Sequence, residues 1–257
     1  MKISIVTTSY NSEKTIEDTI LSVLSQNYQN FEHIIVDGAS KDSTMEIVKK
    51  YEDKYKGRLK YISQPDKGIY DAMNKGIQMA TGDVIGLLNS DDKYANNKIL
   101  KTISETIEKT NCDGIHGNLL YMDEETMTKP QRKWVTKSTN IRRGNITAHP
   151  TLYLKKEIYD KLGLYDLKYK VVADYNFMVK LLLNKNINLV HINEYLIYMR
   201  LGGVSSNGLK GYVYSLKESY KVLKDNNVKH AAIISFIRII KTVWQMITAK
   251  FIKIKEE

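Results

Sequence analysis

A short apolar run that ends in two carboxylates restricts the fold of this chain more than any other feature. Residues 84–88 read Val-Ile-Gly-Leu-Leu, and Asn89, Ser90, Asp91 and Asp92 follow directly. A short apolar run bounded by polar turn residues is typical of a buried strand in a parallel sheet. In open α/β sheets, ligands bind beyond the carboxyl ends of the strands. The run therefore predicts a strand that delivers Asp91 and Asp92 to a ligand site.

Two earlier apolar runs end in the same way. Residues 3–6 lead into 7–11 (Thr-Thr-Ser-Tyr-Asn), and residues 33–36 lead into 37–42 (Asp-Gly-Ala-Ser-Lys-Asp). The carboxyl ends of parallel strands meet at one edge of a sheet. We therefore expect the polar residues that follow the three strands to share one pocket.

Helical patterns separate these strands. Residues 12–25 carry apolar side chains at helical spacing, with Ser12 as the expected N-cap of a helix of about 14 residues. Helices are also expected over 43–55, 69–80, 97–109, 155–162 and 174–183, and strands over 59–62, 114–122 and 187–192. This alternation predicts an α/β fold with a mostly parallel central sheet and helices on both faces.

The formal net charge of +10 is concentrated near the C-terminus. Residues 210–257 carry ten Lys or Arg against four Asp or Glu, a difference of +6, which leaves +4 for the rest. Residues 231–254 are mostly apolar, but Arg238, Lys241 and Lys250 interrupt them, which disfavours a transmembrane span. A basic amphipathic helix on an anionic membrane surface is the expected role of this segment.

The chain is therefore expected to consist of a body over 1–208 and a helical tail over 209–257. The alternatives for the tail are packing on the body or on a second copy of the chain, as a homo-oligomer. Cys112 is the single cysteine, which is typical of a reducing compartment, and the apolar run after Met1 is too short for a signal peptide. We expect a cytoplasmic protein, peripheral on the inner face of the cytoplasmic membrane. Charge alone supports nucleic-acid binding, and we do not expect it.

Two nucleotide-binding signatures are absent from the sequence. No Gly-x-Gly-x-x-Gly follows the first strand, and no Gly-x-x-x-x-Gly-Lys-Ser/Thr occurs anywhere, which disfavours dinucleotide oxidoreductases and P-loop phosphatases. A phosphate site without such a backbone cradle needs a metal ion or cationic side chains. Mg²⁺ or Mn²⁺ is the expected ion, because both prefer carboxylate and phosphate oxygens, and Asp91 and Asp92 are its expected ligands.

A series of motifs runs along the first 205 residues. They are 5–11 (IVTTSYN), 25–26 (SQ), 36–44 (VDGASKDST), 66–76 (DKGIYDAMNKG), 80–83 (ATGD), 88–92 (LNSDD), 172–175 (VADY) and 202–205 (GGVS). In this order they resemble the family 2 glycosyltransferases with the GT-A fold, and within them the colanic-acid and exopolysaccharide-biosynthesis type. The resemblance implies that residues 1–208 form a GT-A domain.

The resemblance also implies a donor site. Thr8, Tyr10, Asn11 and Asp37 would bind the nucleotide, with Tyr10 stacked on the base and Asp37 accepting a hydrogen bond from the base. The alternative is that Tyr10 closes the edge of the core and that Asp37 caps a turn.

Asp91 and Asp92 occupy the Asp-x-Asp region of the family, which binds the metal and contacts ribose or donor sugar. Asn89 stands where the first Asp is commoner, so the division of labour between the two carboxylates stays open. A helix N-cap is the alternative for Asp92.

Three further residues are expected near the donor. Asp71 and Lys75, one helical turn apart, would line the donor-sugar side, and Arg200, before the glycine loop 202–205, would reach the phosphates. The alternatives are a surface ion pair for Asp71 and Lys75 and a plain connection for the loop.

The resemblance makes Asp174 the catalytic base, which removes the proton of the acceptor hydroxyl as that oxygen attacks the anomeric carbon. Some burial of Asp174 is expected, since an exposed aspartate is a weak base. His149, Arg142 and Arg143 would lie on the acceptor side, with a structural histidine and solvated surface charge as the alternatives.

The sequence thus predicts a metal-dependent inverting glycosyltransferase. It would move a sugar from a nucleoside-diphosphate sugar, with UDP favoured, to a saccharide acceptor, lipid-linked, in bacterial surface polysaccharide biosynthesis. One alternative is a catalytically degenerate GT-A protein that acts as a membrane-associated assembly partner, which only Asn89 supports. Another is a sugar-nucleotide pyrophosphorylase, which would need glycine and lysine after the first strand.

Overall fold

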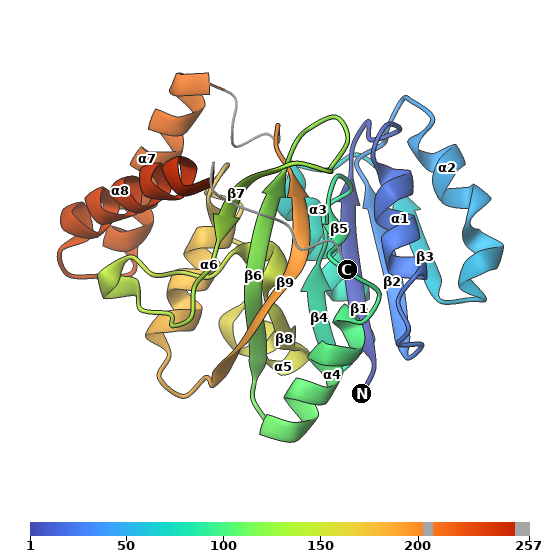
Figure 1. Cartoon of the computed structure of the whole chain (residues 1–257), viewed down its shortest axis with the longest axis horizontal. Helices are drawn as coiled ribbons and strands as arrows, with labels where there is room; N and C mark the ends of the chain where they lie inside the picture. Colours follow the sequence, from blue (N-terminus) through green and yellow to red (C-terminus); the bar gives the residue numbers. More distant parts are fainter. Residues whose placement is uncertain (203–207, 250–257) are drawn as a thin grey trace.

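A single sheet runs through the molecule (Figure 1). The structure is a computed structural model and describes residues 1–202 and 208–249. The strand order is β3-β2-β1-β4-β8-β6-β9-β5, and β7 pairs with β6. The strands are β1 (Ile3–Ser9), β2 (Phe31–Asp37), β3 (Leu59–Ser63), β4 (Val84–Leu87), β5 (Lys93–Tyr94), β6 (Gly114–Met122), β7 (Pro130–Trp134), β8 (Tyr153–Lys155) and β9 (Leu189–Arg200).

The sheet has a parallel half and a mixed half. Strands β3, β2, β1 and β4 are parallel, and β1, β2 and β4 are buried along their whole length. β8 then runs antiparallel to both β4 and β6, whereas β9 is parallel to β6. The predicted α/β fold with a mostly parallel sheet is confirmed, and the antiparallel strand β8 is an element that the sequence pattern does not predict.

Helices cover both faces of the sheet. One apolar core holds side chains of α3 (Ile69–Met79), α5 (Lys156–Leu162) and α6 (Ala173–Leu183). The core on the opposite face holds side chains of α1 (Ile16–Leu24), α2 (Thr44–Lys50) and α4 (Ile99–Thr110). Short 3₁₀ helices occur at η1 (Glu52–Tyr55), η2 (Ile141–Arg143) and η3 (His149–Thr151).

The predicted cap of the first helix is wrong. α1 begins at Ile16 and has nine residues, and the carbonyl of Ser12 accepts the N–H groups of Thr15 and Ile16. The Ser12 hydroxyl instead lies 2.8 Å from that of Ser90. It therefore joins the loop after β1 to the loop after β4, a contact across 78 residues that local sequence does not reveal.

The tail forms two helices, α7 (Gly208–Asp225) and α8 (Ala231–Ala249), at the end of the molecule opposite α2 (Figure 1). Val222, Leu223 and Ile234 are buried in the same core as α6. Lys241 of α8 donates to the carbonyl of Arg143 at 2.7 Å. In residues 1–202 and 208–249, no helix has the length and apolar character that a membrane span needs.

Candidate active site

The carboxyl ends of β1, β2 and β3 are tied together by one carboxylate. Asp37 is fully buried at the end of β2, and its oxygens accept hydrogen bonds from the hydroxyls of Ser9 at 3.0 Å and Ser63 at 2.7 Å. The loop after β2 adds the Ser40 N–H at 2.9 Å and its hydroxyl at 2.5 Å. Four donors satisfy about as many hydrogen bonds as a carboxylate can accept. Asp37 thus fixes the geometry of this edge, and its contact with a base stays a prediction.

Tyr10 stands at the same edge with its side chain 62% exposed. A Cβ atom at Gly38 would lie 3.3 Å from the ring of Tyr10 and 2.8 Å from a carboxylate oxygen of Asp66. Only a residue without a side chain therefore leaves both neighbours in place. An exposed ring beside a bare stretch of backbone is a surface on which a planar base can stack.

Asn11 and Thr8 shape the loop below this ring. Asn11 adopts a left-handed backbone conformation with φ +48°, which asparagine tolerates better than most residues. Its side-chain oxygen accepts the Lys41 N–H at 2.9 Å, and its own N–H donates to the Ser40 hydroxyl at 2.8 Å. Thr8 is buried in β1. Their donor contacts, like that of Asp37, stay predictions.

The two carboxylates after β4 differ in their surroundings. Asp92 is buried, and its oxygens accept hydrogen bonds from the Arg200 N–H at 3.2 Å and from the Asn89 side-chain amide at 3.1 Å. Burial raises the pKa of Asp92 well above its usual value, and the charge of Asp91 raises it further. Burial also raises the pKa of Asp91, which Arg200 partly offsets. A cation bound beside the pair would favour the ionised form of both carboxylates.

A divalent ion suits this donor set. Within the described ranges there is no group of three or more His, Cys, Asp or Glu side chains placed to hold a metal. Mg²⁺ does not need one, because it is commonly bound by one or two carboxylates together with substrate phosphates and water. Asp91 and Asp92 supply such carboxylates, and the hydrogen bonds from Asn89 and from the Arg200 N–H go to Asp92, not to Asp91.

Arg200, at the end of β9, lies beside the pair but does not point its guanidinium at it. The Nη1 atom donates to the carbonyls of Glu124 and Glu125, and Nη2 donates to Asp18 of α1 at 3.1 Å. Its Nε is buried without a hydrogen-bond partner among the described residues. Of the glycine loop 202–205 that follows, residues 203–205 lie outside the described residues. Phosphate binding by Arg200 stays a prediction.

Asp71 and Lys75 form an ion pair on α3, with the ammonium 3.3 Å from the carboxylate. The Lys67 N–H donates to the same carboxylate at 3.0 Å and is the largest cause of the lowered pKa of Asp71. Lys75 also donates to the carbonyl of Pro65. The pair therefore holds the turn before α3, and its contact with donor sugar stays a prediction.

Asp174 is half-buried in the first turn of α6. Its Oδ1 accepts the hydroxyl of Tyr70, from α3, at 2.9 Å. His149 is buried, with Nε2 2.7 Å from the Tyr165 hydroxyl. Burial lowers the pKa of His149, whereas the charge of Asp174 acts in the opposite direction. The structure thus places His149 close enough to Asp174 for the carboxylate charge to act on the imidazole.

Tyr121 of β6 lies near enough to both carboxylate sites for their charges to act on its hydroxyl. Burial raises the pKa of Tyr121, the charge of Arg132 lowers it, and the charges of Asp92 and Asp174 raise it. Arg132 of β7 is paired opposite Tyr121, with its guanidinium 4.0 Å from the centre of that ring. No local pattern in the sequence singles out Tyr70, Tyr121 or Arg132, because only the strand pairing and the contact between α3 and the start of α6 bring them to the site.

Arg142 and Arg143 are exposed in η2, which packs between α6 and α8. Gly144 follows with φ +63°, and a Cβ atom there would stand 3.2 Å from Arg238 of α8. The acceptor contacts of the two arginines stay predictions.

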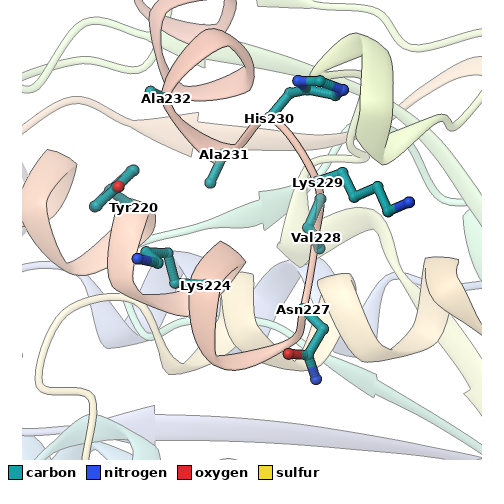
Figure 2. A pocket seen from close by; sticks show the side chains of 8 residues that line it. All are labelled: Tyr220, Lys224, Asn227, Val228, Lys229, His230, Ala231 and Ala232. Atoms are coloured by element: carbon teal, nitrogen blue, oxygen red, sulfur yellow. The ribbon is translucent and has the colours of Figure 1, made fainter.

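Two hollows of the surface lie apart from these residues. One of about 410 Å³ sits at the turn between α7 and α8 and is lined by Lys224, Lys229 and His230 among others (Figure 2). Another of similar size lies between α3 and α5. None of the predicted site residues lines either.

A parallel half-sheet with carboxylates at its carboxyl edge, joined to a mixed half-sheet, is the architecture of the GT-A class of transferases, and known proteins agree. The family model described as "Glycosyl transferase family 2" matches residues 4–165, so this chain belongs to glycosyl transferase family 2. An uncharacterised glycosyltransferase of Haemophilus influenzae is 31% identical over 234 residues, covering 88% of this chain and 91% of its own. A PGL/p-HBAD biosynthesis glycosyltransferase of Mycobacterium bovis is 25% identical over 216 residues, which cover 79% of this chain and 78% of that protein.

Solved structures share the fold. Residues 1–349 of S. aureus TarS in complex with UDP-GlcNAc have a TM-score of 0.68 at 22% identity, over 93% of this chain and 72% of that one. This chain spans 39% of the longer TarS chain. The mannosyltransferase PcManGT of Pyrobaculum calidifontis, in complex with GDP-Man and Mn²⁺, has a TM-score of 0.66 at 13% identity, over 97% and 73%.

Proposed function

We propose that this glycosyltransferase is an inverting, metal-dependent enzyme that uses a nucleoside-diphosphate sugar, with UDP favoured. The observation that carries the proposal is the edge itself, where the exposed ring of Tyr10 follows β1, and the half-buried Asp91 and the buried Asp92 follow the neighbouring strand β4. The similar fold of TarS, which binds UDP-GlcNAc, supports a UDP-sugar.

The donor is proposed to bind across the carboxyl ends of β1, β2 and β4. Tyr10 stacks on the base, while Thr8, Asn11 and Asp37 hold the base and ribose. Asp71 and Lys75 face the sugar, and Arg200 faces the phosphates. Asp91 and Asp92 hold Mg²⁺ or Mn²⁺, which would neutralise charge that develops on the leaving diphosphate.

Asp174 is proposed to act as the base. It takes the proton of the acceptor hydroxyl while that oxygen forms its bond to the anomeric carbon. The bond between the anomeric carbon and the diphosphate oxygen breaks in the same step, so the nucleoside diphosphate leaves and the configuration inverts. The proton ends on Asp174. His149, Arg142 and Arg143 are proposed to lie on the acceptor side.

Nucleotide binding gives the direct test. Thermal unfolding is measured with UDP, GDP, dTDP and CDP, each with and without Mn²⁺, in the intact chain, in Asp91→Asn and in Asp160→Asn. Asp160 is an exposed aspartate of α5 and serves as the matched control. A ligand at a hundred times its Kd raises the midpoint by on the order of 5–10 °C. We expect the largest increase with UDP and Mn²⁺, lost in Asp91→Asn alone. No increase with any nucleotide at millimolar concentration would overturn the proposed donor site.

The acceptor is proposed to be lipid-linked and used at the inner face of the cytoplasmic membrane, in surface polysaccharide synthesis. Support comes from the outer face of α8, where Ile233, Phe236 and Ile240 are each more than half exposed. They are three and four residues apart and so form one stripe along the helix. The cations at the α7–α8 turn (Figure 2) add the positive charge that anionic lipid attracts.

Sedimentation with vesicles tests this placement. The chain is expected to bind vesicles of phosphatidylcholine with phosphatidylglycerol more strongly than phosphatidylcholine alone, and less strongly as salt rises. Ile233→Ser with Phe236→Ser is expected to abolish binding, whereas Leu21→Ser, an exposed leucine of α1, should not. Equal binding by the double variant would contradict the role of α8.

The alternative of a catalytically degenerate GT-A protein loses support when the structure around Asn89 is considered. Its basis was Asn89, yet the amide of Asn89 donates to Asp92 and so organises the pair. An aspartate there could not donate this bond.

A further inference from the structure

The base proposed above has an uncommon neighbour on another helix. The Tyr70 hydroxyl lies 2.9 Å from Asp174 Oδ1 and also 2.9 Å from the carbonyl oxygen of Val171. Tyr70 belongs to the first turn of α3, whereas Val171 and Asp174 bracket the start of α6. Burial raises the pKa of the Tyr70 hydroxyl, and the Asp174 charge adds to it, so the hydroxyl keeps its proton.

A tyrosine hydroxyl has one proton and faces two acceptors of different strength here. A hydrogen bond to an ionised carboxylate is roughly twice as strong as one to a neutral oxygen. The hydroxyl therefore donates to Asp174 while Asp174 is ionised. Once Asp174 holds a proton, its advantage over the Val171 carbonyl is gone, and a rotation of the hydroxyl suffices to satisfy the carbonyl.

We propose that Tyr70 is a positioning residue for Asp174, one that fixes Oδ1 and leaves Oδ2 to take the proton of the acceptor hydroxyl. The inference rests on the proposed function of Asp174 as base. No proton passes through Tyr70: the acceptor proton ends on Asp174, and the hydroxyl only changes its partner.

The ring of Tyr70 is held firmly enough for this task. It packs on the ring of Tyr165 with centres 5.8 Å apart. Asn74, one turn further along α3, donates to the Tyr165 carbonyl and accepts the Tyr165 N–H, both at 2.9 Å. α3 also carries Asp71 and Lys75, so Tyr70 links the proposed donor side to the base.

Other ionisable groups around the pair come from several elements. The charge of Asp174 acts on His149 of η3 and on Tyr121 of β6, and the charge of Glu218 of α7 acts on Tyr70. Glu218 accepts the Val171 N–H at 3.1 Å. Tyr70→Phe removes the hydroxyl and none of these groups, so a change in Asp174 titration in this variant reports the hydroxyl.

The test follows the carboxyl carbon of Asp174 by NMR in protein labelled with ¹³C at aspartate Cγ, assigned by its loss in Asp174→Asn. Tyr70→Phe should move the titration midpoint of this signal up by about one pH unit, because one bond to the ionised form is lost. The matched control is Tyr169→Phe, which removes a tyrosine hydroxyl that donates to Asp225 at 2.6 Å, on α7. It should leave the midpoint unchanged. Para-aminophenylalanine at position 70 keeps a ring donor and should restore it.

Release of UDP from UDP-glucose and UDP-GlcNAc with Mn²⁺ and water as acceptor separates the two proposals. A midpoint in Tyr70→Phe equal to that of the intact chain overturns the Tyr70 inference and leaves the base untouched. UDP release at the full rate in Asp174→Asn overturns the base, and the role of Tyr70 with it. Supporting results are loss of release in Asp174→Asn and, at pH values below the titration midpoint of the intact chain, a fall of about 10-fold in Tyr70→Phe, with an unchanged KM for donor.

Discussion

At the residue scale, the site depends on polar side chains whose partners lie far along the chain. Asp92 shows this best, since its oxygens are bonded to Asn89, three residues away, and to Arg200, 108 residues away. A buried carboxylate beside a second one is costly unless it is hydrogen-bonded or neutralised. The amide of Asn89 and the backbone of Arg200 thus keep Asp92 in place before any cation binds.

Asn89→Asp tests this balance. The change removes the bond to Asp92 and adds a third carboxylate, so the free energy of unfolding without metal should fall by about 2 kcal/mol. Mn²⁺ should then stabilise the variant more than the intact chain, because it neutralises more charge. Thermal melts with EDTA and with Mn²⁺ measure both effects, with exposed Asn97→Asp as control. A metal response equal to that of the intact chain would contradict a cation at this pair.

At the element scale, the helix that carries Asp71, Lys75 and Tyr70 lies very close to the sheet. A Cβ atom at Gly76 of α3 would stand 2.2 Å from a methyl carbon of Val6 in β1. The glycine is thus required for the close approach of helix and strand. This approach sets the height of the proposed donor-side and base-side residues above the strand ends.

Gly76→Ala should destabilise the chain by about 1–3 kcal/mol, because the helix must move away from β1 or Val6 must leave its rotamer. The gain in helix propensity from alanine is smaller than this cost. Urea unfolding measures the difference. Gln78→Ala, at an exposed position of the same helix, should be neutral or slightly stabilising. A loss in Gln78→Ala as large as in Gly76→Ala would show that packing on β1 is not the cause.

At the scale of the whole molecule, the tail helices share the core of the body. Leu223 of α7 is fully buried among side chains of that core, whereas Ile233 of α8 is 58% exposed. A division between residues 208 and 209 would therefore separate one apolar core into two parts. The body and the tail helices are expected to unfold together.

Leu223→Ala should lower the free energy of unfolding by about 2–5 kcal/mol and keep one transition by both circular dichroism and tryptophan fluorescence. Ile233→Ala should have little effect. Two separate transitions would instead support an independent tail.

Acid should weaken the whole fold through buried histidine. His33 lies between the hydroxyls of Thr7 at 2.8 Å and Tyr55 at 2.6 Å, and burial lowers its pKa to about 3. The unfolded chain binds this proton near pH 6.5, so between pH 6.5 and 3 it holds more protons than the folded chain. As the pH is lowered through this range, the free energy of unfolding therefore decreases, by up to about 1.4 kcal/mol per pH unit from this group.

Replacement of the histidine tests that sign. His33→Gln should reduce the pH slope of the unfolding free energy between pH 6 and 4, and His230→Gln, at an exposed position, should not. Asp91 and Asp92, whose pKa values are raised, act in the opposite direction, so the diagnostic quantity is the difference from the intact chain. An unchanged slope in His33→Gln would contradict the buried neutral histidine.

The sequence by itself determined the parallel half of the sheet and the placing of polar residues at its edge. Apolar runs such as 84–88 and the helical spacing after them encode strand and helix locally, and the carboxyl ends of parallel strands meet without further information. The order of short motifs along the chain sufficed for the family, which the family model bears out.

Tertiary structure alone decided what surrounds those residues. The pairing of β9 with β6 brings Arg200 to Asp92, and the packing of α3 on α6 brings Tyr70 to Asp174 across 104 residues. The burial of Leu223 likewise joins the tail to the body. Such contacts leave no local period in the sequence, because they depend on which distant surfaces bury each other, and that is settled only when the whole core is packed.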